Sequence, residues 1–194
     1  ELDDANGSCD INDENCTITM RFADKIPYKD VTVVKAVGNS PNAAVSAARL
    51  GLGVALATNI GDDQNGIECI EALQAEGIDT TFVNKNSGMK TNYHYVLSYE
   101  AERTILIKHE AYKYNFVAPD EAPSWIHLSS IGNDTLAYHD QIADYLEANR
   151  EVKLGFQPGT FQMKLGAEKL SRLYKRTEIH FCNKEEANRI LGTQ

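Results

Sequence analysis

The sequence predicts an α/β fold in which a parallel sheet is flanked by helices and a small antiparallel β-sheet lies outside this body. From Val54 onward, short apolar runs alternate with longer stretches of helical spacing, which is typical of right-handed βαβ units. Other segments are apolar at every second position, as in a sheet with one solvated face. The 194 residues, 42% of them hydrophobic, are enough to bury a core.

The α/β body is expected to alternate strands and helices along the chain. Short apolar runs predict buried strands, which we expect over Val54–Asn59, Trp125–Ser130, Val152–Phe156 and Glu178–Cys182. Between them, helical spacing predicts helices over Gly66–Glu76, about Thr135–Asn149, and Lys164–Arg176. Gly77 follows the first of these helices as a stop signal. A parallel sheet of this kind is expected to be covered on both faces.

The antiparallel sheet is expected to form a lid from two parts of the chain, about residues 16–37 and 92–109. Period-2 spacing marks the segments Cys16–Phe22, Val31–Val37, Asn92–Tyr99 and Thr104–His109. Such a flap serves as a lid, as an interface, or as both. Residues 1–15 are rich in turn formers and are expected to be irregular.

Composition excludes several classes of function. A net charge of -9 and a pI near 5.0 argue against binding to a nucleic-acid backbone, which requires a basic surface. No apolar run approaches the roughly 20 residues of a membrane span. The four cysteines form no CxxC pair, and no signal segment precedes the first strand. We therefore expect a reduced, cytoplasmic protein that acts on a small molecule.

The segment Val37–Ala44 is the first candidate site. Ser40 is a good N-cap and Pro41 suits the first helical position, so a helix is expected to begin there. Gly38 allows close approach of a ligand to the backbone, and Asn39 and Asn42 offer donors and acceptors suited to sugar hydroxyls. The alternative is a well-capped helix with no ligand.

Two further segments carry carboxylates at the start of a helix. Asp62 and Asp63 precede the helix at Gly66; a solvated turn is favoured there over a metal or acid–base pair. Asn183 and Glu186 follow a predicted strand with the spacing of a capping box. The carboxyl end of a parallel strand is also where α/β proteins bind ligands and metals.

Several motifs are absent from the sequence. There is no phosphate-binding P-loop and no GxSxG nucleophile elbow. The GxGxxG dinucleotide fingerprint is incomplete, which disfavours a nicotinamide oxidoreductase. The histidines are dispersed, and we expect each to be a structural, hydrogen-bonded residue rather than a metal ligand: His94, His109, His127, His139 and His180.

Taken in order, these segments resemble the PfkB (ribokinase-like) carbohydrate kinase family from about Cys16 to the end of the chain. The first signature of that family is similar to GNSPNAAVSAARLG. Its G-x-D-x-x-G helix resembles the segment Ala57–Val83, and its lid strand resembles Lys90-Thr91 with Tyr93–Tyr99. Its N-x-x-E segment is similar to FCNKEEANRILG.

The resemblance implies a Rossmann-like body with a β-sheet lid that phosphorylates a sugar or nucleoside hydroxyl from ATP with Mg²⁺. The lid would also form a homodimer. The residues that would hold substrate hydroxyls are Gly38, Asn39, Asn42, Thr91 and Tyr93. Asn183 and Glu186 would organise Mg²⁺ and phosphate, Glu186 through water. Such chemistry needs mainly positioning and charge neutralisation.

The sequence also departs from the family pattern. Val37 stands where the family commonly has a second glycine, and Gln157 replaces a frequent Asp or Asn. The G-A-G-D segment with the catalytic base is absent, as is the first strand with its substrate-binding Asp. We therefore expect residues 16–194 to be a partial kinase domain that has no catalytic residue and is inactive alone.

The sequence leaves two hypotheses of the function and two interpretations of the tyrosines open. The alternative to a kinase is a non-catalytic sugar- or nucleoside-binding, or dimerising, protein on the same scaffold. Tyr93, Tyr95 and Tyr99 would favour a nucleoside if they stack on a base. The alternative is that they are packing residues of a half-buried strand.

Overall fold

The computed structural model describes residues 7–8, 17–99 and 102–193. The chain divides into two compact units, one of Glu1–Val34 with Asn92–His109 and one of Lys35–Thr91 with Glu110–Gln194. Each is described by itself. Apart from Gly7 and Ser8, the segment expected to be irregular lies outside the described residues, as do Cys9 and Cys16.

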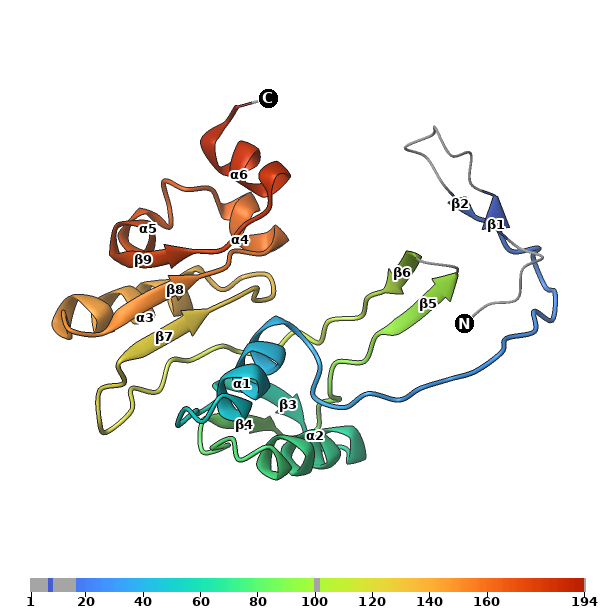
Figure 1. The fold of residues 1–194 in the computed structure, drawn as a ribbon, viewed down its shortest axis with the longest axis horizontal. Helices are drawn as coiled ribbons and strands as arrows, with labels where there is room; N and C mark the ends of the chain where they lie inside the picture. The colour runs from blue at the N-terminus through green and yellow to red at the C-terminus, as the bar shows by residue number, and fades with distance from the viewer. Residues whose placement is uncertain (1–6, 9–16, 100–101, 194) are drawn as a thin grey trace. The chain divides into compact units, whose positions relative to one another are not determined.

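The larger unit begins with two helices and a pair of parallel strands (Figure 1). Helix α1 (Asn39–Arg49) precedes β3 (Thr58–Gly61), α2 (Gln64–Ala75) and β4 (Val83–Asn86). Strand β3 pairs in parallel with β4, and it begins later than the predicted Val54–Asn59. Only an isolated parallel bridge from Ala55 to Asp79 extends the pairing backward. Apolar side chains from both helices form a small core with Leu56 and Ile78.

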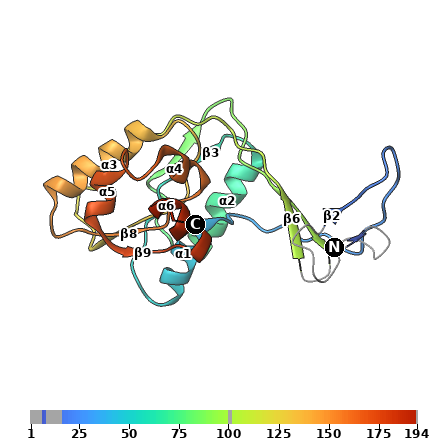
Figure 2. The ribbon, with the colours of Figure 1, turned by 90° about the horizontal axis from the view of Figure 1, so that it is seen from above.

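The second part of the larger unit is a three-stranded parallel sheet in the order β7-β8-β9. Its elements are β7 (Trp125–Leu128), α3 (Leu136–Ala148), β8 (Lys153–Phe156), α4 (Thr160–Leu165), α5 (Ser171–Arg176), β9 (Thr177–His180) and α6 (Lys184–Leu191). Figure 2 shows α3 and α5 together on one side of β8 and β9. The predicted alternation of strands and helices with parallel pairing is therefore confirmed.

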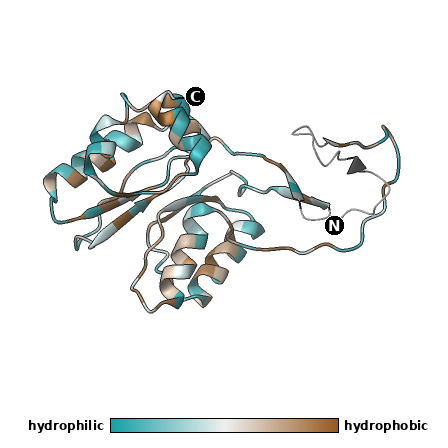
Figure 3. Ribbon diagram, turned by 45° about the horizontal axis from the view of Figure 1, so that its top comes forward, coloured by the Kyte–Doolittle hydropathy of each residue, from teal (hydrophilic) through white to brown (hydrophobic). Residues whose placement is uncertain are grey.

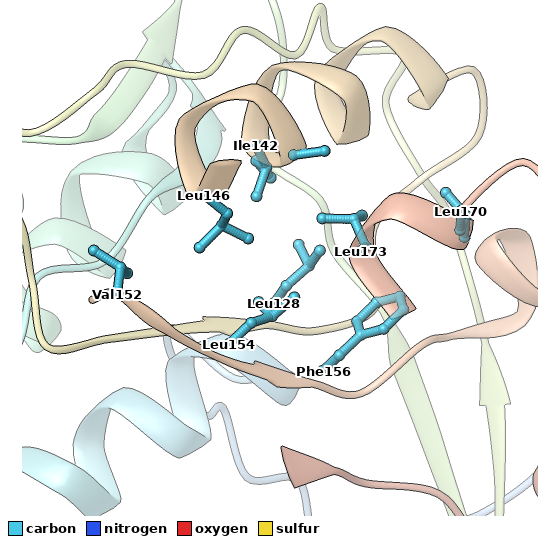
Figure 4. Packing of buried hydrophobic residues seen from close by; sticks show 9 residues of the cluster. Leu128, Ile142, Leu146, Val152, Leu154, Phe156, Leu170 and Leu173 are labelled. Atoms are coloured by element: carbon cyan, nitrogen blue, oxygen red, sulfur yellow. The ribbon is translucent and has the colours of Figure 1, made fainter. Parts of the chain in front are cut away.

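One face of this sheet carries the main core of the chain. Leu154 and Phe156 of β8 are fully buried against Leu146 of α3 and Leu173 of α5, and Figure 4 shows these side chains converging between the sheet and the helices. Burial of each such side chain contributes about 1.5–3 kcal/mol. The helices show both apolar and polar stretches (Figure 3), as expected for helices with one buried face.

The helix predicted over Lys164–Arg176 is wrong as a single element. It is divided into α4, which starts earlier at Thr160, and α5, which starts at Ser171. Gly166 lies between them with φ 88°, a conformation that glycine adopts without steric cost and that ends a helix. None of the helices in the described part of the chain has the length and apolar composition needed to cross a membrane.

The other face of the β7-β8-β9 sheet is only partly covered by the described residues. Trp125 and Ile179 of the two edge strands and Phe181 after β9 are each 44% exposed. The central strand β8 is buried at the consecutive residues 154–156, which alternate between opposite faces of the sheet, so cover on both faces is complete at β8 and partial at the edges. His127 and His180, expected inside core strands, are exposed as well. The ring of His127 lies 5.6 Å from that of Phe181, so it contacts an aromatic side chain at the surface.

The smaller unit is built from antiparallel strands, as predicted. Strand β5 (Tyr95–Tyr99) pairs with β6 (Glu102–Leu106), and a two-residue strand β1 (Gly7–Ser8) pairs with β2 (Thr17–Ile18). Residues 31–37, predicted to be a strand, form none in the described structure. Their valines are 56–70% exposed, and a strand requires a pairing partner that this segment does not have among the described residues.

Candidate functional site

The first turn of α1 is the central feature of the candidate site. Gly38 occupies the N-cap position with φ 151°, and no side chain caps the helix. Ser40, predicted to be the N-cap, is instead the second helical residue, so that prediction is wrong. Its hydroxyl oxygen lies 2.5 Å from the hydroxyl oxygen of Ser129. Pro41 is then the third helical residue, still within the turn whose N–H groups need no intrahelical partner.

The geometry around Gly38 explains why a glycine stands there. A Cβ on Gly38 would meet only Pro41, at 3.7 Å, so space is not limiting. The φ of 151° is limiting, because side-chain-bearing residues rarely adopt it. The Asn42 N–H donates to the Gly38 carbonyl at 2.9 Å, and its Oδ1 lies 3.5 Å from the Gly38 nitrogen. The turn between Gly38 and Asn42 is therefore closed on itself.

This turn presents polar groups to solvent. The side chains of Asn39 and Asn42 are exposed, and the N–H groups of Asn39 and Ser40 have no partner inside the helix. Helix N-termini attract oxygen atoms that carry negative charge or lone pairs. Together, the two amide side chains and the N–H groups that the helix does not use can bind the hydroxyl oxygens of a polyol.

A second polar cluster joins the start of α2 to the segment after β4. Asp63 caps α2 by accepting from the Gly66 N–H at 3.0 Å. Its carboxylate also accepts from the Thr91 hydroxyl at 2.6 Å and from the Thr91 N–H at 3.1 Å. These bonds, the hydroxyl of Thr91 first, lower the pKa of Asp63. The carboxylate therefore serves as a helix cap and a clamp.

Asp62 also has a structural partner, which supports the turn predicted here. It accepts from the Gly88 N–H at 2.9 Å and from the Ser87 hydroxyl at 3.2 Å. The backbone bond from Gly88 is the main cause of its lowered pKa. The two neighbouring acids thus bind different parts of the segment after β4. The turn was predicted, and the structure adds that both carboxylates hold this segment in place.

Two glycines make this close approach possible. A Cβ on Gly61 would lie 2.4 Å from the Lys90 backbone carbon, and one on Gly66 would lie 2.5 Å from the Gly61 carbonyl oxygen. Both distances are too short for any side chain. The Thr91 hydroxyl also accepts from the Gly61 N–H at 3.1 Å, so the two glycines of the G-x-D-x-x-G segment allow the chain to pack tightly beside β3.

The capping box predicted at α6 is confirmed. The Glu186 N–H donates to Asn183 Oδ1 at 2.8 Å, and the Asn183 N–H donates to Glu186 Oε2 at 3.0 Å. Both residues are exposed or partly exposed at the start of the helix that follows β9. The carboxylate therefore lies at the carboxyl end of a parallel strand, where the sequence predicted it.

The whole chain, apart from its first residue, matches the model of the pfkB family of carbohydrate kinases, over residues 2–194. The chain belongs to this family. It is 24% identical over 154 residues to an uncharacterized sugar kinase of Archaeoglobus fulgidus, a match that covers 75% of this chain and 60% of the relative.

Solved structures of similar fold agree with this assignment. A PfkB protein from Polaromonas sp. has a TM-score of 0.65 at 26% identity, with 78% of this chain and 56% of that chain covered. A fructokinase from Vibrio cholerae, solved with fructose, ADP and calcium, has a TM-score of 0.63 at 19% identity, with 83% and 57% covered. The present chain thus spans less than two thirds of the length of these relatives.

The fold brings together some of the residues expected from the pfkB family resemblance. Gly38, Asn39 and Asn42 share the first turn of α1. Thr91 is a buried residue of the segment that follows β4 in the larger unit, and its hydroxyl bonds to Asp63 and Gly61. Tyr93 belongs to the smaller unit, where its ring lies 5.2 Å from that of Tyr95.

The pfkB family resemblance also implies Mg²⁺, and the Asn183–Glu186 pair is compatible with it. Mg²⁺ is usually held by one or two carboxylates, waters and substrate phosphates rather than by a complete protein cage. The capping bond occupies Glu186 Oε2 only. Within the described residues, no group of three or more His, Cys, Asp and Glu side chains could hold a metal. One carboxylate acting through water fits both observations.

Sequence reasoning missed the residues beneath α1. Ser129 follows β7 at the carboxyl end of a parallel strand, the position where α/β folds place functional groups, and that was the available signal. Gln162 and His139 are 0% and 1% exposed. His139 is the hydrogen-bonded histidine that the sequence predicted, but the bonds that join Gln162 to Ser129 and to His139 connect positions 33 and 23 residues apart, and no local pattern indicates them.

Proposed function

We propose that this chain supplies the substrate-binding part of an ATP-dependent kinase that phosphorylates a hydroxyl of a sugar or a nucleoside. The observation that carries the proposal is the match to the pfkB carbohydrate kinase family over residues 2–194. The exposed amide groups at the start of α1 support it, because they suit a ligand with several hydroxyls.

In this proposal the first turn of α1 binds and orients the substrate. The N–H groups of Asn39 and Ser40 and the side chain of Asn42 hold hydroxyl oxygens, while Gly38 keeps the backbone open to close approach. Thr91, which is held by Asp63, anchors the segment that follows β4. Tyr93 stays a further candidate for contact with the substrate. Correct orientation lowers the entropic cost of reaction.

Bound ATP with Mg²⁺ would supply the phosphoryl group and neutralise its charge. At the start of α6, Asn183 and Glu186 would help to hold Mg²⁺ and the phosphate, and Glu186 would do so through a water molecule. The sequence contains no G-A-G-D segment, which carries the base of the family. The purified chain is therefore expected to bind substrate but not to turn it over.

Binding and turnover test the proposal separately. NMR titration of the chain with D-fructose, D-ribose, D-glucose and adenosine should shift the amide resonances of Asn39 and Asn42 with at least one ligand. Gly38→Ala should weaken that binding, because its φ of 151° is unfavourable for alanine. Val45→Ala, further along α1, serves as the control and should bind normally.

The longer kinase that contains this segment, incubated with ATP, Mg²⁺ and the same panel extended to further pentoses, hexoses and nucleosides, should transfer phosphate to at least one. Failure to phosphorylate any of them would refute the kinase hypothesis and favour the alternative of a non-catalytic binding protein. Turnover by the present chain alone would contradict the inferred absence of the base.

We also propose that the β5-β6 hairpin mediates self-association. Val96 and Ile105 are cross-strand partners on one face of the hairpin, and their side chains are 51% and 43% exposed. Exposed apolar side chains that lie next to each other favour a protein interface. Size-exclusion chromatography with light scattering should give a dimer, and Val96→Glu should shift it to monomer. If the longer kinase that contains this segment stays monomeric at high concentration, this proposal is wrong.

A further inference from the structure

A buried chain of hydrogen bonds runs from α3 to the start of α1. It consists of His139, Gln162, Ser129 and Ser40, all within the larger unit. Three of these side chains are at most 1% exposed. Buried polar groups are stabilising only when fully bonded, so the geometry of each link determines what this chain of bonds does.

The first link defines the state of the histidine ring. His139 Nδ1 lies 2.6 Å from the carbonyl oxygen of Thr135. A carbonyl can only accept, so Nδ1 carries the hydrogen. His139 Nε2 lies 3.0 Å from the side-chain nitrogen of Gln162, which can only donate. The ring is therefore neutral with its hydrogen on Nδ1, in agreement with the pKa of His139 being lowered by burial.

The second link defines the orientation of the glutamine amide. The Gln162 nitrogen also donates to the Ser129 carbonyl at 3.0 Å, and its oxygen accepts from the Gly159 N–H at 2.7 Å. A flipped amide would place its oxygen against two acceptors. Gln162 therefore has a single orientation, and it joins the segments that follow β7 and β8.

These two segments are in direct contact as well. A Cβ on Gly159 would lie 1.9 Å from the Ser130 hydroxyl oxygen, so only glycine allows this approach. With its carbonyl held by Gln162, Ser129 directs its hydroxyl to Ser40 at 2.5 Å. Ser40 is the second residue of α1, between the residues assigned to substrate hydroxyls.

We propose that Gln162 and His139 are positioning residues for the substrate-binding turn: through Ser129 and Ser40 they hold the first turn of α1 in the orientation that Asn39 and Asn42 need. This inference rests on the proposed function for the identity of the ligand. The bonds themselves do not depend on it.

The first test measures the network without any ligand. Nitrogen-15 NMR of the histidine rings should show His139 neutral with its hydrogen on Nδ1. Gln162→Glu should add a second hydrogen at Nε2, because a carboxylate oxygen would face that nitrogen. If the His139 ring carries hydrogens on both nitrogens in the wild type, or if Gln162→Glu leaves the ring unchanged, the hydrogen bonds assigned to His139 and Gln162 are wrong.

The second test measures positioning. Hydrogen exchange of the Asn42 N–H, which bonds to Gly38, should accelerate about ten-fold in Ser40→Ala, roughly the effect of one lost hydrogen bond. Ser46→Ala is the matched control, since the same substitution is made on the same helix at an exposed position, and it should have no effect. Ser40→Ala tests the proposal even if Gln162→Glu fails to fold.

Binding of D-fructose, D-ribose and adenosine then links positioning to function. For each of these ligands that the wild type binds, the affinity should fall at least about three-fold in Ser40→Ala and stay unchanged in Ser46→Ala. Normal binding and normal Asn42 exchange in Ser40→Ala would overturn the positioning role. If the wild type binds none while exchange changes as expected, the turn is held by the network and the proposed function is what fails.

Discussion

Replacement of Gly66 by alanine separates two effects that act in opposite directions. Gly66 is the third residue of α2, and an alanine inside a helix is about 1 kcal/mol more favourable than glycine. Local propensity alone therefore predicts a more stable protein. The tertiary structure predicts the reverse, because the new Cβ would lie 2.5 Å from the Gly61 carbonyl oxygen and 2.9 Å from Thr91 Oγ1.

The size of the effect follows from which atoms must move. Overpacking typically costs about 1–3 kcal/mol, and the upper end applies here because a backbone oxygen of β3 cannot rotate away. Displacement of the Thr91 hydroxyl also weakens its bond to Asp63, at about 1 kcal/mol. After the gain in helix propensity, we expect a net destabilisation of about 2–3 kcal/mol.

Urea unfolding followed by circular dichroism measures this difference. Gly53→Ala is the matched control, since a Cβ there meets nothing within 4 Å and its φ is not positive; it should be neutral or up to about 1 kcal/mol more stable. A Gly66→Ala protein that unfolds at the same or a higher urea concentration than the wild type would refute the steric account.

Three further predictions concern the clamp, the core and the buried histidine. Asp63→Ala should lose about 2–3 kcal/mol of unfolding free energy, from a lost cap and lost charged hydrogen bonds; an equal loss in exposed Asp62→Ala would contradict this. Leu146→Ala should lose about 2–5 kcal/mol, since this side chain is 0% exposed, whereas Leu50→Ala, at an 82% exposed position, should change little. Burial lowers the pKa of His139, so the unfolded state binds more protons just below its ordinary pKa of about 6.5. The contribution of His139 should be complete above that pH and decline as the pH falls, at up to about 1.4 kcal/mol per pH unit; urea titrations at pH 7.5 and 5.5 should show this extra slope in the wild type and not in His139→Gln.

The candidate site was predictable where its interactions are local. Asn183 and Glu186 are three residues apart, and the capping box formed as their spacing predicted. The start of α1 was predicted within two residues, but the cap was assigned to Ser40. That error arose because the serine hydroxyl bonds to Ser129, 89 positions away, which no local rule can anticipate.

Other features were outside the reach of any pattern in the sequence. The contact between Ser40 and Ser129 joins side chains 89 positions apart. Gly61 and Gly66 match a family spacing, but their steric necessity comes from residues 89–91 that pack against them. In both cases the partner is supplied by the fold.

Hydrophobic periodicity and the Gly, Asn and Asp residues at helix ends were sufficient to predict the class of fold and most of its strands and helices, because these signals act over one to four residues. The family was indicated by the resemblance of whole motifs in their order along the chain, and the family match over residues 2–194 shows it. The tertiary structure alone decided that Asp63 holds Thr91 and that His139, Gln162, Ser129 and Ser40 form one buried chain of bonds. Such bonds form only after parallel strands bring distant segments to the same edge of a sheet, and their strength depends on burial that no single segment provides.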